Sequence, residues 1–147
     1  MLIPIASDHA GFTLKGELKV ELEKLGHTVL DLGTNDLSSV DFPDYATLVT
    51  DAINDQRATL GVLICGTGIG MSITANKVHG IRAALCRTEF EARMARQHND
   101  CNVLCLGQRV TGTGLAIEIL KAFLSATFEG GRHAARVAKI TAVEAKR

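Results

Sequence analysis

The chain has 147 residues, 16 basic and 16 acidic side chains, and a formal net charge of zero. This balance argues against a nucleic-acid-binding protein, which normally carries a basic excess. Aromatic residues make up only 4% and Trp is absent, which argues against a surface that stacks on bases. The length suits one folded unit, and we predict a single domain over residues 1–147.

No targeting or membrane segment is recognisable in the sequence. The N-terminus lacks a basic stretch followed by a long apolar core, and no apolar run approaches the roughly 18 residues of a membrane span. We therefore expect a cytoplasmic protein with no membrane partner, whose cysteines stay reduced. No Cys-x-x-Cys pair occurs, and Cys65 and Cys86 lie far from the later two. A zinc site at His98, Cys101 and Cys105 is a minor alternative.

The N-terminal half begins with an apolar strand over residues 2–6. A helix follows, with leucines at 14, 18, 22 and 25 on one face, and it ends near Gly26. A second strand covers 28–32, a polar loop 33–43 and a second helix 44–54. A third strand over 60–64 is apolar throughout, as in a sheet that is buried on both faces.

The C-terminal half continues the alternation. A glycine-rich loop opens a third helix, strands are predicted over 81–86 and 103–106, and helices over 88–97, 114–124 and about 131–146. Five strands that alternate with helices predict an α/β fold, a three-layer αβα sandwich that is Rossmann-like, with a five-stranded parallel sheet. Ligands of such sheets bind beyond the carboxyl ends of the strands, so the loops that follow strands are the candidate sites.

The stretch LICGTGIGMSITANK, residues 63–77, places a thiol at the mouth of a glycine loop. Gly66, Gly68 and Gly70 allow the backbone to approach a ligand closely. The spacing fits neither the dinucleotide fingerprint nor the phosphate loop of nucleotide hydrolases. N–H groups at a helix start favour a thiolate and can hold an oxyanion. From spacing alone, a reactive Cys65 and an ordinary buried strand cysteine are equally good interpretations.

Two further clusters carry polar side chains. His98 ends the fourth helix beside Asn99 and can serve as an acid–base group near neutral pH. Arg132 and Arg136 are four residues apart on one helix face, where they repel each other unless they share an anion such as phosphate. Taken singly, the histidine fits an ordinary surface residue and the arginines a solvated face. Together with the thiol, they indicate a cofactor-free proton-transfer enzyme for a phosphorylated metabolite.

Five segments together resemble the ribose/galactose isomerase family, which includes the B-type ribose-5-phosphate isomerases and the galactose-6-phosphate isomerase subunits. They are SDHAGF (7–12), ICGTGIGMSITANK (64–77), GIRAAL (80–85), RQHNDCNVLCLGQRV (96–110) and EGGRHAAR (129–136). They span nearly the whole chain in family order. The combination of a cysteine and a histidine favours the ribose-type branch.

The resemblance implies an aldose–ketose isomerase that interconverts ribose 5-phosphate and ribulose 5-phosphate through an enediolate, without metal or cofactor. It makes Cys65 the general base and His98 the group that opens the sugar ring. Thr67 and the N–H groups of the loop would hold the substrate oxygens; these loop residues are Gly66, Gly68, Ile69 and Gly70.

The resemblance also implies binding positions and a partner. Asp8, His9 and Asn99 match positions that bind the sugar, and the phosphate-contacting positions are Arg109, Arg132 and Arg136. The implied assembly is a homodimer or a dimer of dimers with a shared active site. The C-terminal helix, about 131–146, would pack on the partner subunit.

One departure from the family pattern concerns the choice of substrate. Phe42 stands where the family commonly has Tyr, so a hydroxyl group near the substrate is missing. Members of the family also act on hexose or tetrose phosphates, so allose 6-phosphate and erythrulose 4-phosphate stay open as alternative substrates. A non-catalytic sugar-phosphate sensor is an alternative from another class, although it does not need Cys65 and His98 together.

Overall fold

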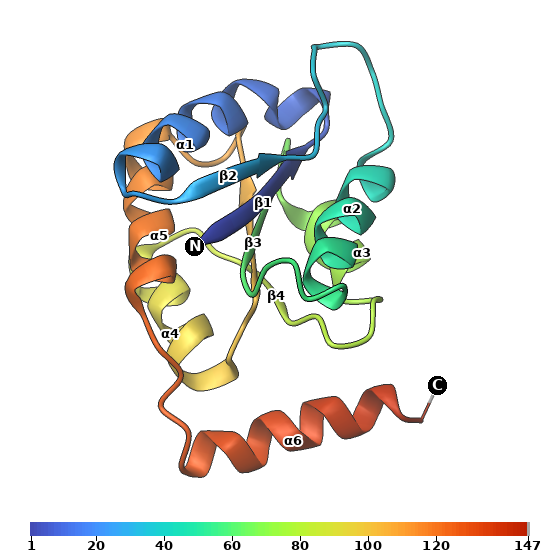
Figure 1. Cartoon of the computed structure of the whole chain (residues 1–147), viewed down its shortest axis with the longest axis vertical. Coiled ribbons are helices and arrows are strands. Elements are labelled where there is room, and N and C mark those ends of the chain that lie inside the picture. The colour runs from blue at the N-terminus through green and yellow to red at the C-terminus, as the bar shows by residue number, and fades with distance from the viewer. Residues whose placement is uncertain (147) are drawn as a thin grey trace.

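A parallel sheet lies between two layers of helices in the computed structural model, which describes residues 1–146 (Figure 1). The strand order is β2-β1-β3-β5-β4, and every pairing is parallel. The predicted three-layer α/β fold is confirmed. The elements are β1 (Leu2–Ser7), a 3-10 turn (His9–Gly11), α1 (Phe12–Lys24), β2 (Thr28–Asp31), α2 (Phe42–Asn54), β3 (Gly61–Cys65), α3 (Ile69–Ala75), β4 (Ala83–Leu85), α4 (Glu89–Asn99), β5 (Val103–Gly107), α5 (Thr113–Ser125) and α6 (Arg132–Glu144).

The central strands are apolar because both faces of the sheet are covered. In β3, Val62 and Ile64 belong to the core that the sheet forms with α1, α4 and α5. Leu63 and Cys65 belong to the opposite core, formed with α2 and α3. Successive side chains of a strand point to opposite faces, so an unbroken apolar run is needed to fill both cores.

Two predicted boundaries differ from the structure. Helix α2 begins at Phe42, two residues before the predicted start, because Pro43 lies in its first turn, where its missing N–H costs nothing. Strand β4 covers only Ala83–Leu85 at the sheet edge, whereas the apolar run predicted a strand over 81–86. The other boundaries agree to within about two residues, which is the usual uncertainty of element ends.

Lys15 is a charged residue in the core, with only 2% of its side chain exposed. Its ammonium group donates to Asp31 at 2.6 Å and to the carbonyl oxygen of Thr34 at 2.7 Å. Burial alone would raise the pKa of Asp31, but hydrogen bonds from Lys15 and Lys19 outweigh that effect and lower it. The buried cation therefore ties the loop after β2 to helix α1.

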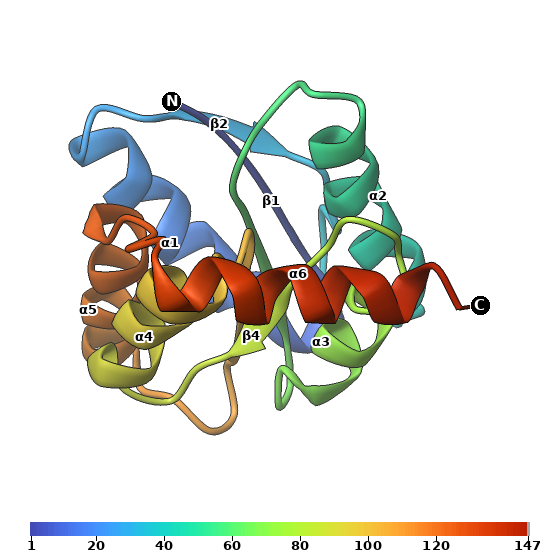
Figure 2. The same ribbon diagram turned by 90° about the horizontal axis from the view of Figure 1, so that it is seen from below.

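Helix α6 lies apart from the two helical layers and runs across one end of the sheet, below β4 (Figures 1 and 2). The Glu144 carboxylate at its far end accepts the Gly80 N–H at 3.2 Å. An apolar groove of about 670 Å³ lies between β4, α4 and α6. Phe90, Ile140 and Val143 line this groove and are 64%, 42% and 55% exposed.

None of the helices within residues 1–146 has the length and apolar character that a membrane crossing requires.

Candidate active site

Between β1 and β3, the sheet has a position where the connections that follow the two neighbouring strands lead to opposite sides of the sheet. Strand β1 is followed by β2 on one side, whereas β3 has β5 and β4 on the other. The carboxyl ends of β1 and β3 therefore border the crevice where ligands of such sheets bind. Asp8 follows β1 and Cys65 ends β3, so both predicted site residues lie at this crevice.

The loop after β3 wraps around the Cys65 thiol. The N–H of Gly68 donates to the Cys65 Sγ at 3.0 Å, and the Ile69 N–H donates to the Thr67 Oγ1 at 3.3 Å. Gly68 adopts a φ of 78°, a left-handed conformation that favours glycine, where the loop turns into α3. The sulfur is only slightly exposed, and this N–H can stabilise it when it carries a negative charge.

The glycine loop is closely packed against the end of β5. A methyl group on Gly107 would lie 2.5 Å from the backbone of Thr67, and one on Gly68 would lie 2.9 Å from the backbone of Leu106. Neither position therefore has room for a side chain. This packing holds the N–H groups of the loop in one arrangement before a ligand arrives, as oxyanion stabilisation requires.

Asp8 and His9 organise the neighbouring loop after β1. The Asp8 carboxylate accepts the N–H groups of Ala10 and Gly11 at 2.9 and 3.0 Å. The His9 Nδ1 accepts the Val40 N–H at 3.2 Å and so joins this turn to the loop before α2. Both side chains have structural partners at the crevice.

Two larger side chains cover the glycine loop. Arg109, just after β5, lies over Gly66, where a methyl group would be 3.4 to 3.5 Å from its guanidinium end. The Phe42 ring lies against Gly70, where a methyl group would be 2.7 Å from the ring. We call the residues at this edge of the sheet the carboxyl-edge group; they are Asp8, His9, Cys65, Gly66, Thr67, Gly68, Ile69, Gly70 and Arg109.

His98 lies at the other edge of the sheet. Helix α4 leads from β4 into the amino end of β5, and His98 is in its last turn. Cys65 pairs with Gly107 at the carboxyl end of β5. The four residue steps from Val103 to Gly107 span about 13 Å. Within one chain, the thiol and the imidazole are therefore not brought together.

The predicted phosphate-binding arginines of α6 accompany His98. The Glu129 N–H donates to the Gln97 carbonyl oxygen at 3.0 Å, which brings the start of α6 beside the end of α4. Arg132 and Arg136 are exposed there, as is Asn99. We call the residues His98, Asn99, Arg132 and Arg136 the amino-edge group.

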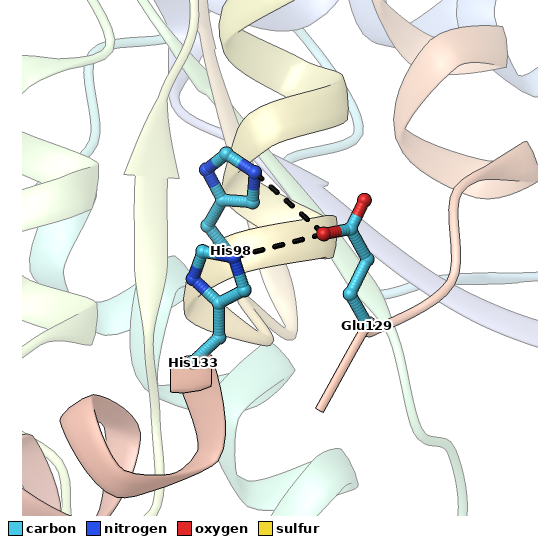
Figure 3. A group of neighbouring side chains, drawn as sticks. All are labelled: His98, Glu129 and His133. Atoms are coloured by element: carbon cyan, nitrogen blue, oxygen red, sulfur yellow. Dashed lines mark ion pairs between the residues drawn. The ribbon is translucent and has the colours of Figure 1, made fainter. Parts of the chain in front are cut away.

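The buried side chain of His133 lies beside His98 of the amino-edge group (Figure 3). Its ring stacks on the His98 ring with the centroids 4.2 Å apart and the planes within 5°. Burial and the neighbouring His98 and Arg132 charges lower the pKa of His133, although the Glu129 carboxylate opposes this. The His133 imidazole is therefore held largely neutral near pH 7.

Comparison with known proteins identifies the family of the chain. A sequence profile of the ribose/galactose isomerase family matches residues 3–140. The chain belongs to the ribose/galactose isomerase family.

Individual relatives agree over nearly their full length. Ribose-5-phosphate isomerase B of Escherichia coli is 48% identical over 145 residues, which are 99% of this chain and 97% of that protein. The solved structure of Clostridium thermocellum ribose-5-phosphate isomerase B is 51% identical, covers 99% of both chains and has a TM-score of 0.98. That of Thermotoga maritima is 50% identical, covers 96% of this chain and 97% of its own, and has a TM-score of 0.94. The family resemblance inferred from the five motifs is confirmed.

The sequence did not indicate which residues hold the last turn of α4, which carries His98, in place. Asp100 has a left-handed conformation, and its carboxylate accepts from Arg82 at 2.9 Å and from Arg96 at 3.0 Å. Arg82 also donates to the carbonyl oxygen of Asn99 at 3.1 Å. The segment GIRAAL contains Arg82, but nothing in it signals a contact to a residue 18 positions later.

The remaining cysteines are buried core residues. Burial raises the pKa of Cys86 to about 12 and that of Cys101 to about 11, and it also raises that of the fully buried Cys105. Within residues 1–146, the side chains that could together hold a metal ion are His98, Glu129 and His133, and no cysteine is among them. The structure therefore does not support the alternative zinc site that includes Cys101 and Cys105.

Proposed function

We propose that this chain interconverts ribose 5-phosphate and ribulose 5-phosphate in a homodimer, or a dimer of dimers, whose active sites are each shared by two subunits. The separation of the two groups carries the proposal: thiol and imidazole lie at opposite edges of one sheet, although the chemistry needs both on one sugar. A second copy can supply the amino-edge group to the carboxyl-edge group of the first. The B-type relatives named above favour the pentose as substrate.

The proposed reaction begins with ring opening. His98 takes the proton of the anomeric hydroxyl and delivers a proton to the ring oxygen, which leaves an open-chain aldehyde. The Cys65 thiolate then removes the proton from C2, and the carbonyl oxygen becomes an enediolate oxyanion. Thr67 and the N–H groups of Gly66, Gly68, Ile69 and Gly70 stabilise that charge. The hydroxyl proton of O2 moves to O1, so that the carbonyl group forms at C2, and the same thiol returns the carbon-bound proton to C1. The protein therefore ends in its starting protonation state.

The phosphate end of the sugar is assigned to arginines, because a guanidinium group binds phosphate with two parallel hydrogen bonds. Arg109 lies over Gly66, the residue after Cys65, whereas Arg132 and Arg136 would come from the other subunit. Asp8, His9 and Asn99 would contact the hydroxyl groups of the sugar. Fixing both ends of the substrate favours the reactive orientation.

Helix α6 is the element that we assign to the subunit contact. Its exposed apolar residues and the groove beside β4 leave an apolar surface open on the single chain. Burial of Ile140, Val143 and Phe90 against a second copy would remove that surface from water. It would also hold Arg132 and Arg136 at a subunit boundary.

The reaction is tested by the turnover of ribose 5-phosphate in the presence of a chelator, with allose 6-phosphate and erythrulose 4-phosphate in parallel. We expect the highest kcat/KM for the pentose. We expect Cys65→Ala to lose about 10²–10⁴-fold in kcat while it still folds, because a general base contributes that much. Full turnover by this variant would exclude the role of Cys65. Binding of all three sugars without turnover would instead indicate a sensor.

The shared site is tested by mixing two inactive variants, Cys65→Ala and His98→Ala. In a mixed dimer, one site has lost both groups and the other retains both. Random exchange of subunits should restore about one quarter of the wild-type activity, since half of the dimers are mixed and each has one intact site. If each chain held a complete site, the mixture would stay inactive.

A further inference from the structure

Three possible metal ligands converge where helix α4 ends and α6 begins. His98 comes from the last turn of α4, and Glu129 and His133 lie on either side of the α6 start (Figure 3). The His98 Nε2 is 3.9 Å from the Glu129 Oε2, and the His133 Nε2 is 3.6 Å from the same oxygen. The three donor atoms all lie within 4.8 Å of one another.

These distances leave room for one ion at the centre of the three atoms. The three donor atoms form a triangle with sides of 3.6 and 3.9 Å and a third side of at most 4.8 Å, so the point equidistant from the three atoms lies at most about 2.4 Å from each. Zn–N and Zn–O bonds are about 2.0–2.2 Å long. By distance alone, each donor atom would have to move only a few tenths of an ångström to reach these bond lengths. Two imidazoles and one carboxylate are also the donor set of many zinc sites with an open fourth position.

We propose that His98, Glu129 and His133 bind a divalent transition-metal ion, with Zn²⁺ as the best match, and that the bound ion inhibits isomerisation by occupying a lone pair of His98. The inhibition rests on the proposed function, but the binding does not. The ion is an inhibitor in this proposal and takes no part in the reaction.

The surroundings set the expected strength of binding. The two rings are parallel, so one of them must turn before both lone pairs point at the same ion. The His98 side chain is 37% exposed and can turn, whereas the His133 side chain is only 7% exposed and provides the fixed ligand. The charges of Arg132 and Arg136 lie close enough to act on His133 and oppose a dication. We therefore expect micromolar rather than nanomolar affinity.

Binding is measured on the full-length Cys65→Ala protein, which removes the one thiol of the carboxyl-edge group that could compete for zinc. Calorimetry with Zn²⁺ should give one ion per chain, and Co²⁺ should give the visible absorption of a four-coordinate site. In the Cys65→Ala background, His133→Ala should abolish both signals. The matched control is His79→Ala, because the exposed His79 faces Glu144 at 3.7 Å without a second imidazole. Equal binding by the His133→Ala and His79→Ala proteins would overturn the proposal.

Inhibition is measured separately on proteins that keep Cys65. Zn²⁺ should lower the turnover of ribose 5-phosphate, and a chelator should restore it. In Glu129→Gln the zinc concentration for half inhibition should rise at least about tenfold, since even residues that only support metal ligands change affinity by 10–100-fold. An unchanged midpoint in Glu129→Gln would overturn inhibition through this site. An enzyme that turns over no sugar phosphate would refute the proposed function, while the calorimetric result would still decide the metal site.

Discussion

Substitution of Gly68 by alanine tests whether the close packing of the glycine loop positions the Cys65 site. The backbone at Gly68 has a φ of 78°, a conformation that costs an alanine about 1–2 kcal/mol. The new methyl group would also lie 2.9 and 3.0 Å from the carbonyl carbon and oxygen of Leu106. Backbone cannot move aside as a side chain can, so we add about 1–3 kcal/mol for overpacking. The expected loss in free energy of unfolding is about 2–5 kcal/mol.

Gly80 provides a matched control for this substitution. It also has a φ of 78°, but a methyl group there would meet only the Asn54 side-chain oxygen, at 3.4 Å. Gly80→Ala should therefore cost only the backbone strain of about 1–2 kcal/mol.

Urea denaturation of both variants measures the difference. With a slope of about 1–3 kcal/mol per molar urea, Gly68→Ala should unfold at a midpoint roughly 1 M below that of Gly80→Ala. Its isomerase activity should also fall, because the Gly68 N–H would shift away from the Cys65 sulfur. Equal midpoints for the two variants would refute the argument that the loop is held by contact with β5.

Two further predictions concern buried charge and buried thiols. Asp31→Asn leaves Lys15 buried without an anionic partner and should cost about 3–5 kcal/mol, whereas Asp36→Asn in an exposed loop should cost less than about 1 kcal/mol. The pKa of Asp31 is lowered in the folded state, so its contribution to stability is complete above the ordinary carboxyl pKa and is lost as the pH falls below that value. The urea midpoint of the wild type should therefore drop more steeply below pH 4 than that of Asp31→Asn. Similar acid profiles for the two proteins would contradict this reasoning. Burial raises the pKa of Cys86 to about 12 and that of Cys101 to about 11, so both thiols should resist disulfide reagents at pH 8 until urea unfolds the chain. Mass spectrometry of labelled peptides measures this, and rapid labelling of Cys86 in the native protein would contradict the assigned burial.

Several features of the protein could be read from the sequence because they depend on neighbours along the chain. The leucine spacing before Gly26 and the apolar run at 60–64 report local periodicity, and that periodicity determines helix or strand. The position of Cys65 follows from the same logic, since a residue at the end of a buried parallel strand must lie at the ligand-binding edge. The family motifs added candidate roles for residues whose local patterns were ambiguous.

The tertiary structure decided which of these residues meet. The insertion of β5 between β3 and β4 depends on contacts between segments far apart in the chain, which no local pattern encodes. The same holds for Lys15, whose charge predicts exposure although Asp31 holds it in the core. The sequence predicts that His98 and Cys65 act on the same substrate, yet the alternation of strand and returning helix places them at opposite edges of the sheet. A helix that connects parallel strands must run back to the amino edge, so its last turn lies a full strand length away from the crevice.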